Sequence, residues 1–246
     1  MDFKYLQVII LAAVFALQYI FEHVYPQRKE INSWKNERFN ILVGIGNILV
    51  TFIPAALLVQ GLQFAADHHL GLLYQFTTPF WLQLVVGIFL LDCWMYFWHK
   101  LNHIIPFFWR FHSFHHKDEK MNTTTAIRFH FAELLMSYPG KALVCFIFGI
   151  GYTPLLVYEL LFFVAVIVHH SNIYISPAVD RVYRMLFSSP IMHRIHHSNL
   201  WEHTNSNYGA LFSFWDRLFK SLNLQSSKNV QFGLPANNTQ PLHNNK

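Results

Sequence analysis

Eight of the 16 histidines in this 246-residue chain fall into three tight groups. Each group contains histidines three or four residues apart, a spacing that places side chains on one face of a helix. Imidazole is a common ligand of transition metals. Because eight converging imidazoles exceed the needs of one four-coordinate ion, the pattern predicts a site for two metal ions. The groups are His99 and His103, then His112, His115 and His116, then His193, His196 and His197.

A few further residues could belong to the same site. Asp92 lies two turns before His99, where it could accept a hydrogen bond from a ligand imidazole or form a purely local contact. His130 and His170 could each be a metal ligand or an ordinary hydrogen-bonding histidine. Ser189, followed by proline, is a suitable N-cap, so we expect the third histidine group to begin a helix.

The ligand types favour some reactions over others. Imidazole suits zinc, copper, iron and nickel, so the ligands alone do not select one metal. The chain has no HExxH, GxSxG or P-loop motif, which argues against the common zinc hydrolases, serine hydrolases and nucleotide-binding enzymes. The ExxH pairs of soluble di-iron bundles are also absent. A histidine-rich pair of metals in an apolar chain therefore suggests oxygen chemistry on a lipid.

The elements that would carry these histidines are apolar enough to cross a membrane. Apolar residues make up 53% of the chain and charged residues only 13%, about half of what a soluble domain usually has. A spanning helix needs about 20 mostly apolar residues. The last two candidates are short and could be a re-entrant pair that turns at 149–151. The candidates are residues 6–21, 41–64 with a kink at Pro54, 80–98, 134–150 and 154–168.

Basic residues are confined to one side of this predicted topology. All lysines and arginines except Lys4 and Lys141 fall in the loop 22–40, in the segment 99–133 or after residue 169. The positive-inside rule assigns that side to the cytoplasm. All three histidine groups lie on the same side. We therefore expect the metal site at the cytoplasmic face of the membrane.

Together these patterns predict an all-α integral membrane protein. Four to five spanning or re-entrant helices would carry a cytoplasmic helical cap that holds a histidine-rich dimetal site. We expect membrane anchor helices in residues 1–78, the catalytic region in 79–225, and a polar, flexible tail in 226–246.

Over roughly residues 80 to 220 the chain resembles the fatty acid hydroxylase/sterol desaturase superfamily of integral-membrane di-iron enzymes. The resemblance covers the order and spacing of the histidine groups together with the residues around them. The matching motifs begin with Asp92, His99 and His103, continue through His112, His115, His116, Arg128, His130, Glu133, His170 and Asn172, and end with Pro190, His193, His196, His197, Asn207, Tyr208, Gly209, Trp215, Asp216 and Arg217.

This resemblance implies that the eight grouped histidines ligate two iron ions, with zinc as a substitute in a purified sample. It implies that His130 and His170 are extra ligands or close supports, and it places Asp92, Glu133 and Asn207 at the catalytic site. Dioxygen would be the co-substrate, and a C–H bond of a lipid would be hydroxylated or desaturated. Since no His-Pro-Gly-Gly motif of a fused cytochrome b5 domain is present, we expect a separate cytochrome b5- or ferredoxin-type electron donor. We expect no nucleic-acid partner.

Three alternatives stay open at this point. Within the same family, the enzyme could cleave an alkylglycerol ether lipid after hydroxylation next to the ether oxygen. A non-catalytic metal-binding or metal-transporting membrane protein would be expected to place its ligands at the bilayer midplane instead. A protein with a purely structural zinc is a third possibility. Sterol, fatty acyl chain, carotenoid and alkylglycerol are all candidate substrates.

Overall fold

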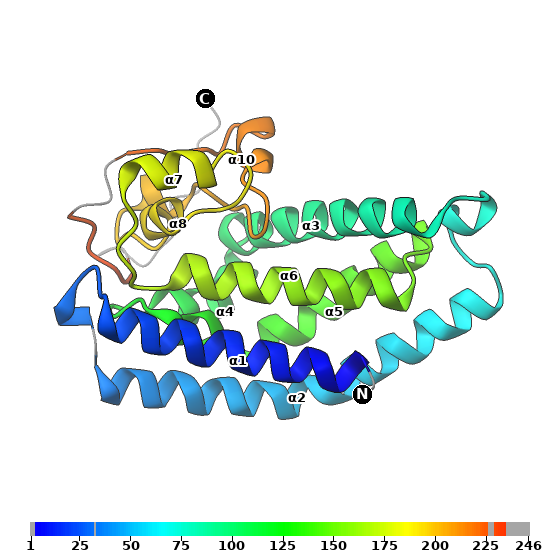
Figure 1. The fold of residues 1–246 in the computed structure, drawn as a ribbon, viewed down its shortest axis with the longest axis horizontal. Helices are drawn as coiled ribbons and strands as arrows, with labels where there is room; N and C mark the ends of the chain where they lie inside the picture. Colours follow the sequence, from blue (N-terminus) through cyan, green and yellow to red (C-terminus); the bar gives the residue numbers. More distant parts are fainter. Residues whose placement is uncertain (1–2, 32, 226–228, 235–246) are drawn as a thin grey trace.

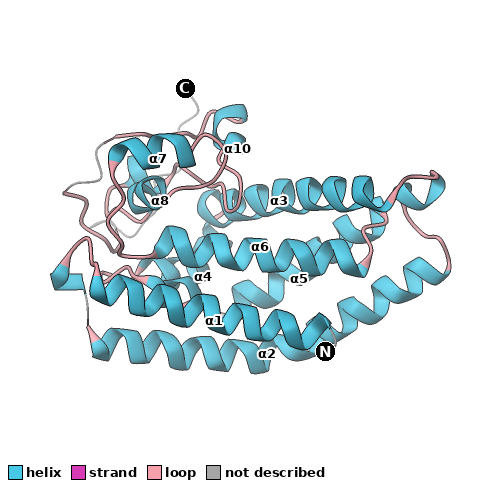
Figure 2. Ribbon diagram, viewed as in Figure 1, coloured by secondary structure: helices cyan, strands magenta, loops and turns pink. Residues whose placement is uncertain are grey.

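The computed structural model describes residues 3–31, 33–225 and 229–234, and the regular elements among them are helices joined by loops, as predicted (Figure 2). Only three isolated bridges, and no strand, occur among them. The elements are α1 (Phe3–Val24), η1 (Lys29–Ile31), α2 (Trp34–Asp67), η2 (Leu72–Gln75), α3 (Phe80–Ile104), α4 (Pro106–His116), η3 (Thr123–Ile127), α5 (Phe131–Phe148), α6 (Tyr152–His170), α7 (Pro177–Tyr183), α8 (Pro190–His196), α9 (Trp201–Thr204) and α10 (Phe214–Leu218).

Five helices, α1, α2, α3, α5 and α6, are long and apolar enough to cross a membrane, which confirms the predicted multi-pass protein. They run along the longest axis of the molecule (Figure 1). Helix α2 packs on α5, and α6 packs on α1 and α3. Large apolar side chains such as Leu49 and Phe52 are more than two-thirds exposed, as expected for residues that face lipid.

Two predicted breaks in the spans are present. Helix α2 continues through Pro54 as one helix, and Figure 1 shows its axis changing direction in its second half. A proline inside a helix removes one backbone hydrogen bond and kinks the axis. Helix α5 ends at Gly149, whose φ of 70° lies in the left-handed region that favours glycine. Helix α6 begins three residues later, so α5 and α6 form the predicted hairpin.

The shorter elements α4, η3 and α7 to α10 form a cap at one end of the spans, where α3 and α6 end and α5 begins (Figure 1). Buried polar residues tie this cap to the spans. The Glu22 carboxylate of α1 accepts hydrogen bonds from the backbone N–H groups of Thr123 and Asn172. Asp118 accepts hydrogen bonds from Asn40 of α2 and from Thr125. These contacts hold α1, α2 and the cap in one arrangement.

Part of the predicted tail belongs to the cap. Val230 is buried, and its carbonyl accepts a hydrogen bond from Arg28 at 2.6 Å. Asn199 donates its backbone N–H to the carbonyl of Gln231 at 2.8 Å. Residues 229–234 therefore differ from the flexible tail expected from position 226, because the cap offers them hydrogen bonds and an apolar contact. Residues 226–228 and 235–246 lie outside the described part of the chain.

We predict that Gly140→Ala lowers the unfolding temperature of the purified protein. A Cβ at Gly140 in α5 would overlap the indole ring of Trp94 in α3. Overpacking of this kind costs about 1–3 kcal/mol. The matched control is Gly46→Ala in α2, where a Cβ meets no atom within 4 Å and where alanine favours the helix by about 0.5–1 kcal/mol. Equal unfolding temperatures for the two variants would contradict the close contact of α3 and α5.

Candidate metal centre

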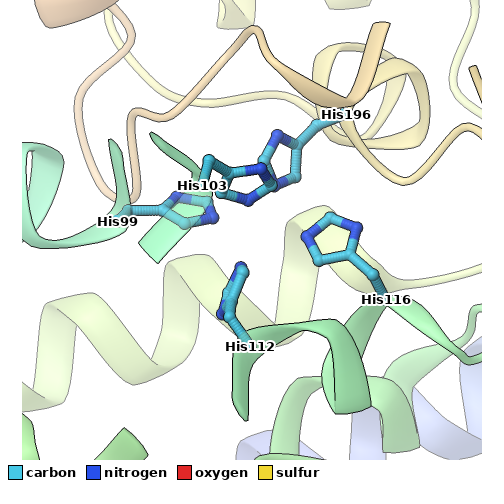
Figure 3. Close-up of side chains that lie close together, drawn as sticks. All are labelled: His99, His103, His112, His116 and His196. Carbon is cyan, nitrogen blue, oxygen red and sulfur yellow. The ribbon is translucent and has the colours of Figure 1, made fainter. Parts of the chain in front are cut away.

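Nine buried or nearly buried histidines form two adjacent groups in the cap and at the ends of α3 and α6. In each group the candidate ligand atoms all lie within 4.8 Å of one another. The five rings of the first group converge on a common centre (Figure 3). The first group is His99, His103, His112, His116 and His196, and the second is His115, His170, His193 and His197.

The helical spacing explains how the histidine groups of the sequence are divided. Residues i and i+4 share a face of a helix, whereas i+3 points to a neighbouring direction. On α4, His112 and His116 belong to the first group and His115 to the second. At α8 the pattern is reversed, since His193 and His197 belong to the second group and the intervening histidine to the first. Each HxxHH motif therefore contributes to both groups and links them.

Burial favours the neutral form of three histidines in the cap. It lowers the pKa of His116, His196 and His197 well below the usual value, because a charged ring would lose its hydration. Neutral imidazole is the form that binds metals. Both ring nitrogens of His116 and His197 are buried without a hydrogen-bond partner. A buried nitrogen without a hydrogen-bond partner destabilises a folded protein, so such atoms are rare. They are expected where a metal ion is the missing partner.

Backbone carbonyls fix the orientation of four other rings. The Nδ1 atoms of His99 and His196 lie 2.9 Å and 2.7 Å from the carbonyls of Tyr208 and Ser206. In the same way, Nδ1 of His115 and His170 lies 3.1 Å and 2.7 Å from the carbonyls of Arg128 and Val166. A carbonyl can only accept, so Nδ1 carries the proton and Nε2 keeps its lone pair. Metal-binding histidines commonly show this arrangement.

The second group brings such lone pairs together. Nε2 of His170 lies 3.0 Å from Nε2 of His115 and 2.9 Å from Nε2 of His193. Because Nε2 of His115 and His170 carries no proton when Nδ1 donates, the first contact is a repulsion between lone pairs unless a cation lies between them. Both nitrogens could bind one ion at the usual metal–nitrogen distance of about 2.0–2.1 Å. The residues present therefore fit two metal ions.

Glu133 supports the first group. Its Oε1 accepts a hydrogen bond from Nδ1 of His112 at 2.8 Å, and both side chains are buried. A carboxylate in this position orients the ring and raises the basicity of the nitrogen that faces the metal. Glu133 is therefore a positioning residue. Of the two carboxylates expected at the catalytic site, Asp92 and Glu133, it is Glu133 that contacts a candidate ligand.

We predict that Glu133→Ala weakens metal binding to the first group by about 10- to 100-fold. Glu133→Gln should retain most of the affinity, because its amide oxygen can still accept the hydrogen bond from His112. Competition with a chelator of known affinity measures the effect. Glu202→Ala is the matched control, since the Glu202 side chain is 75% exposed. Wild-type affinity in Glu133→Ala would contradict a supporting role for this carboxylate.

Asp92 lies in the same region but contacts no histidine. Its carboxylate accepts hydrogen bonds from Tyr158, from Trp215 and from the backbone N–H groups of Leu211 and Phe212. These bonds hold the 205–216 segment against α3. The segment carries the carbonyls that orient the first group, so Asp92 acts on the loop and not on a ligand ring. These partners lie far from Asp92 in the sequence, so neither the hydrogen bond to a ligand imidazole nor the local contact considered for Asp92 is present.

Asn207 also holds this segment. It adopts a φ of 54°, and its side chain donates to the carbonyls of Met192 and Asn223 and accepts from the backbone N–H of Asn223. Its neighbours Ser206 and Tyr208 provide the carbonyls that bond His196 and His99. Asn207 therefore sets the position of two acceptors and contacts neither of the two histidine groups itself.

His130 is the one predicted ligand that the fold places outside both groups. Its Nδ1 accepts a hydrogen bond from the backbone N–H of Ala132 at 3.1 Å, so it caps the start of α5. Its ring packs against Phe111 and Phe131. His130 is thus a support next to Glu133, and its sequence context alone did not distinguish a ligand from an N-cap.

His169 was not among the expected site residues. It is buried, and its ring centroid lies 3.9 Å from that of His193. Its only signal in the sequence is its position beside His170 at the end of an apolar run. The backbone carbonyls that orient the ligands carry no sequence signal, because every residue has one.

A cavity of about 340 Å³ opens within the spans and reaches both histidine groups. Residues from α2, α3, α5 and α6 line it, and its walls are mostly apolar. At the cap end it contacts His99 and His112 of the first group and His115, His170 and His193 of the second. An apolar molecule could therefore reach the candidate metal centre from within the bilayer, with little water around it.

Comparison with known proteins agrees with this site. A family model described as fatty acid hydroxylase matches residues 84–221. The ornithine lipid hydroxylase OlsE of Rhizobium tropici is 26% identical over 231 residues, which cover 89% of this chain and 67% of that protein. The alkylglycerol monooxygenase of Caenorhabditis elegans is 28% identical over 138 residues, covering 54% of this chain and 26% of that protein. The human alkylglycerol monooxygenase is 25% identical over 167 residues, covering 66% and 35%. No solved structure matched.

The matched region contains all nine grouped histidines, and it covers more than half of the chain. The curated relatives are named as hydroxylases or monooxygenases, which confirms the expected class of lipid-directed oxidoreductase. The chain spans about a third or less of the alkylglycerol monooxygenases, so that similarity concerns only part of those proteins. With the family model covering the metal centre and its supporting residues, the chain belongs to the fatty acid hydroxylase family.

Proposed function

We propose that this protein hydroxylates an unactivated C–H bond of a membrane lipid, using dioxygen and electrons from a separate protein. One observation carries the proposal: two adjacent groups of buried or nearly buried histidines lie at the end of a mostly apolar cavity within the spans. The relatives named as lipid hydroxylase and monooxygenase favour hydroxylation over desaturation.

The metals are proposed to be two iron ions, held by the five histidines of the first group and the four of the second. Bound iron would supply the redox chemistry that couples reduction of dioxygen to oxidation of a C–H bond. Imidazole also binds zinc, and zinc binds more tightly than iron to many such sites, so a purified sample could carry zinc instead. Metal analysis together with activity after reconstitution with each metal tests the assignment.

The chain itself contributes position. Apolar side chains of Trp98, Phe162 and Phe163 line the cavity and would exclude water from the reacting carbon. Glu133 holds His112 in place, and carbonyls hold four other rings. Holding a substrate carbon at a fixed place beside the metals turns an intermolecular reaction into an intramolecular one.

The metal centre is proposed to face the cytoplasm. Within the described part of the chain, the lysines and arginines other than Lys4 and Lys141 lie in the cap or at the neighbouring ends of the spans, and the positive-inside rule assigns that side to the cytoplasm. This orientation would give a cytochrome b5- or ferredoxin-type donor access to the cap. Arg181 is an exposed residue of the cap. The thiol of an Arg181→Cys variant should react with a membrane-impermeant thiol reagent only in inside-out vesicles.

The decisive experiment compares total lipids of cells with and without this chain under isotopically labelled dioxygen. The expected product is a lipid that has gained one labelled oxygen atom, and the substrate should fall by the same amount. The control is the His193→Ala/His196→Ala variant, which should give no product. Lipid conversion that persists in this variant, or that carries no label, would overturn the proposed oxygenase.

A second candidate is cleavage of an ether lipid, which the similarity to alkylglycerol monooxygenases favours. Hydroxylation of the carbon next to the ether oxygen gives an unstable product that separates into an aldehyde and an alcohol. The same lipid comparison distinguishes the two functions. A stable hydroxylated lipid supports simple hydroxylation, whereas loss of alkylglycerols with formation of a labelled aldehyde supports ether cleavage.

A further inference from the structure

One ion pair lies inside the membrane-spanning part of the molecule, away from the histidines. Lys141 of α5 and Glu159 of α6 are joined at 2.5 Å, and both lie near the middle of their helices. Charged side chains at this depth are costly and usually face a cavity or a partner. Both residues line the cavity that leads to the metal centre. The Glu159 side chain keeps 33% of its surface exposed although it is paired.

The pair connects α5 and α6, which share α2 and α3 as packing neighbours. Helix α6 packs on α1 as well. Lys141 and Glu159 thus meet across the cavity wall. Tyr138 and Thr51 line the same part of the cavity, and the Lys141 Nζ lies 5.5 Å from the Tyr138 ring centroid. The cavity therefore has a second polar region besides the histidines.

The wall between the two polar regions is mostly apolar, with Ser137 of α5 as a polar residue along it. Glu133, which bonds His112, and Lys141 are both on α5 and eight residues apart. A rise of 1.5 Å per residue separates them by about 12 Å along the helix. An extended alkyl chain zigzags, so each C–C bond of about 1.5 Å advances the chain by only about 1.25 Å, and roughly ten carbons would span this distance. Leu134, Phe162 and Val166 are among the apolar residues between the two regions.

We propose that the Lys141–Glu159 pair binds a neutral polar group of the lipid substrate, a hydroxyl or an amide, and so places the carbon about 12 Å away at the metal centre. This inference rests on the proposed function. An ammonium donates and a carboxylate accepts, so the pair is complementary to a group that does both. Because the two charges compensate each other, a ligand group with a net charge would be left unbalanced in the low-dielectric cavity.

The test measures binding and not turnover. Purified, metal-loaded protein in detergent is titrated with four labelled probes that share one alkyl chain: hexadecane, hexadecanol, hexadecanoate and hexadecylamine. The wild type should bind hexadecanol about tenfold more tightly than hexadecane, the effect of one or two buried hydrogen bonds. Hexadecanoate and hexadecylamine should bind less tightly than hexadecanol.

The variant Lys141→Met/Glu159→Leu removes both charges at similar volume, which a fold usually tolerates better than the loss of one partner. In this variant the tenfold preference for hexadecanol should fall to about one, while hexadecane binding stays the same. Asp180→Asn is the matched control, since it breaks the Arg184–Asp180 ion pair in the cap, outside the cavity. It should keep the preference.

Three results would overturn the inference: equal binding of hexadecane and hexadecanol to the wild type, tightest binding of a charged probe, or a preference that survives in the double variant. The last result would place the hydroxyl elsewhere, for example at the histidines. Failure of the proposed function looks different, because it leaves the probe preference intact while the lipids of cells gain no labelled oxygen.

Discussion

Replacing His196 by alanine is expected to reduce the metal content of the purified protein from two ions per chain to about one, and to abolish lipid hydroxylation. His196 is one of five histidines in the first group, and its Nδ1 is already bonded to the Ser206 carbonyl, so its Nε2 is directed at the group's centre. Loss of residues that only support a ligand costs 10- to 100-fold in affinity or activity, so loss of the ligand should cost at least about a hundredfold. Elemental analysis and the labelled-oxygen assay measure the two effects.

His197, the next residue along the chain, belongs to the second group, and His197→Ala makes the corresponding change there. Because each variant removes a ligand from a different group, each should retain the other metal. His203→Ala is the matched control: this histidine is also buried, but it bonds Ser198 and Gln225 and lies outside both groups. Full loss of both metals in each variant would mean that the nine histidines bind as one unit and not as two groups.

The sequence predicted those parts of the molecule that depend on local pattern. Apolar runs of sufficient length identified all five spans, and the glycines at 149 and 151 identified the turn between the last two. The spacing of the HxxHH motifs identified their histidines as neighbours, since helical geometry brings residues three and four apart together. Both kinds of inference use information within about twenty residues of sequence.

The division of these histidines into two groups could not be predicted in the same way. It depends on the rotation of α4 and α8 about their axes relative to α3 and α6, which long-range packing determines. His115 joins His170 and not His112 for this reason. The outcome for His170 and the outcome for His130 differ although both were weighed equally. The end of α6 carries His170 into the second group, whereas Nδ1 of His130 caps the start of α5.

Asp92 illustrates the same limit. Helical periodicity correctly places it on the face of α3 that carries His99, yet its carboxylate bonds the 205–216 segment. That segment has backbone N–H groups and an indole N–H that need acceptors when buried, and a carboxylate satisfies several of them at once. Which partner a buried carboxylate meets is decided by a loop more than a hundred residues away in the sequence.

Removal of the metals is expected to loosen the cap while the spans remain folded. The spans are held in the membrane by their apolar surface, which does not depend on metal. The cap helix α4 meets the end of α8 through histidines such as His116 and His197, whose ring centroids lie 4.3 Å apart. His115 of α4 also faces His170 of α6, with their Nε2 lone pairs 3.0 Å apart. Each bound ion stabilises the folded form by about 3 kcal/mol when the free metal is a hundred times above its Kd, and this contribution is lost on chelation.

Hydrogen exchange followed by mass spectrometry should therefore show faster exchange in residues 106–116 and 190–197 after chelation, with little change in α2 and α5 outside the cap contacts. Re-addition of ferrous iron should restore protection. In the His196→Ala/His197→Ala variant, which lacks one ligand from each group, chelation should change exchange much less. If chelation left the wild-type cap as protected as before, the buried histidines would have to be stable through packing and hydrogen bonds alone. In that case the repulsion between their facing lone pairs would have to be relieved by a proton and not by a metal ion.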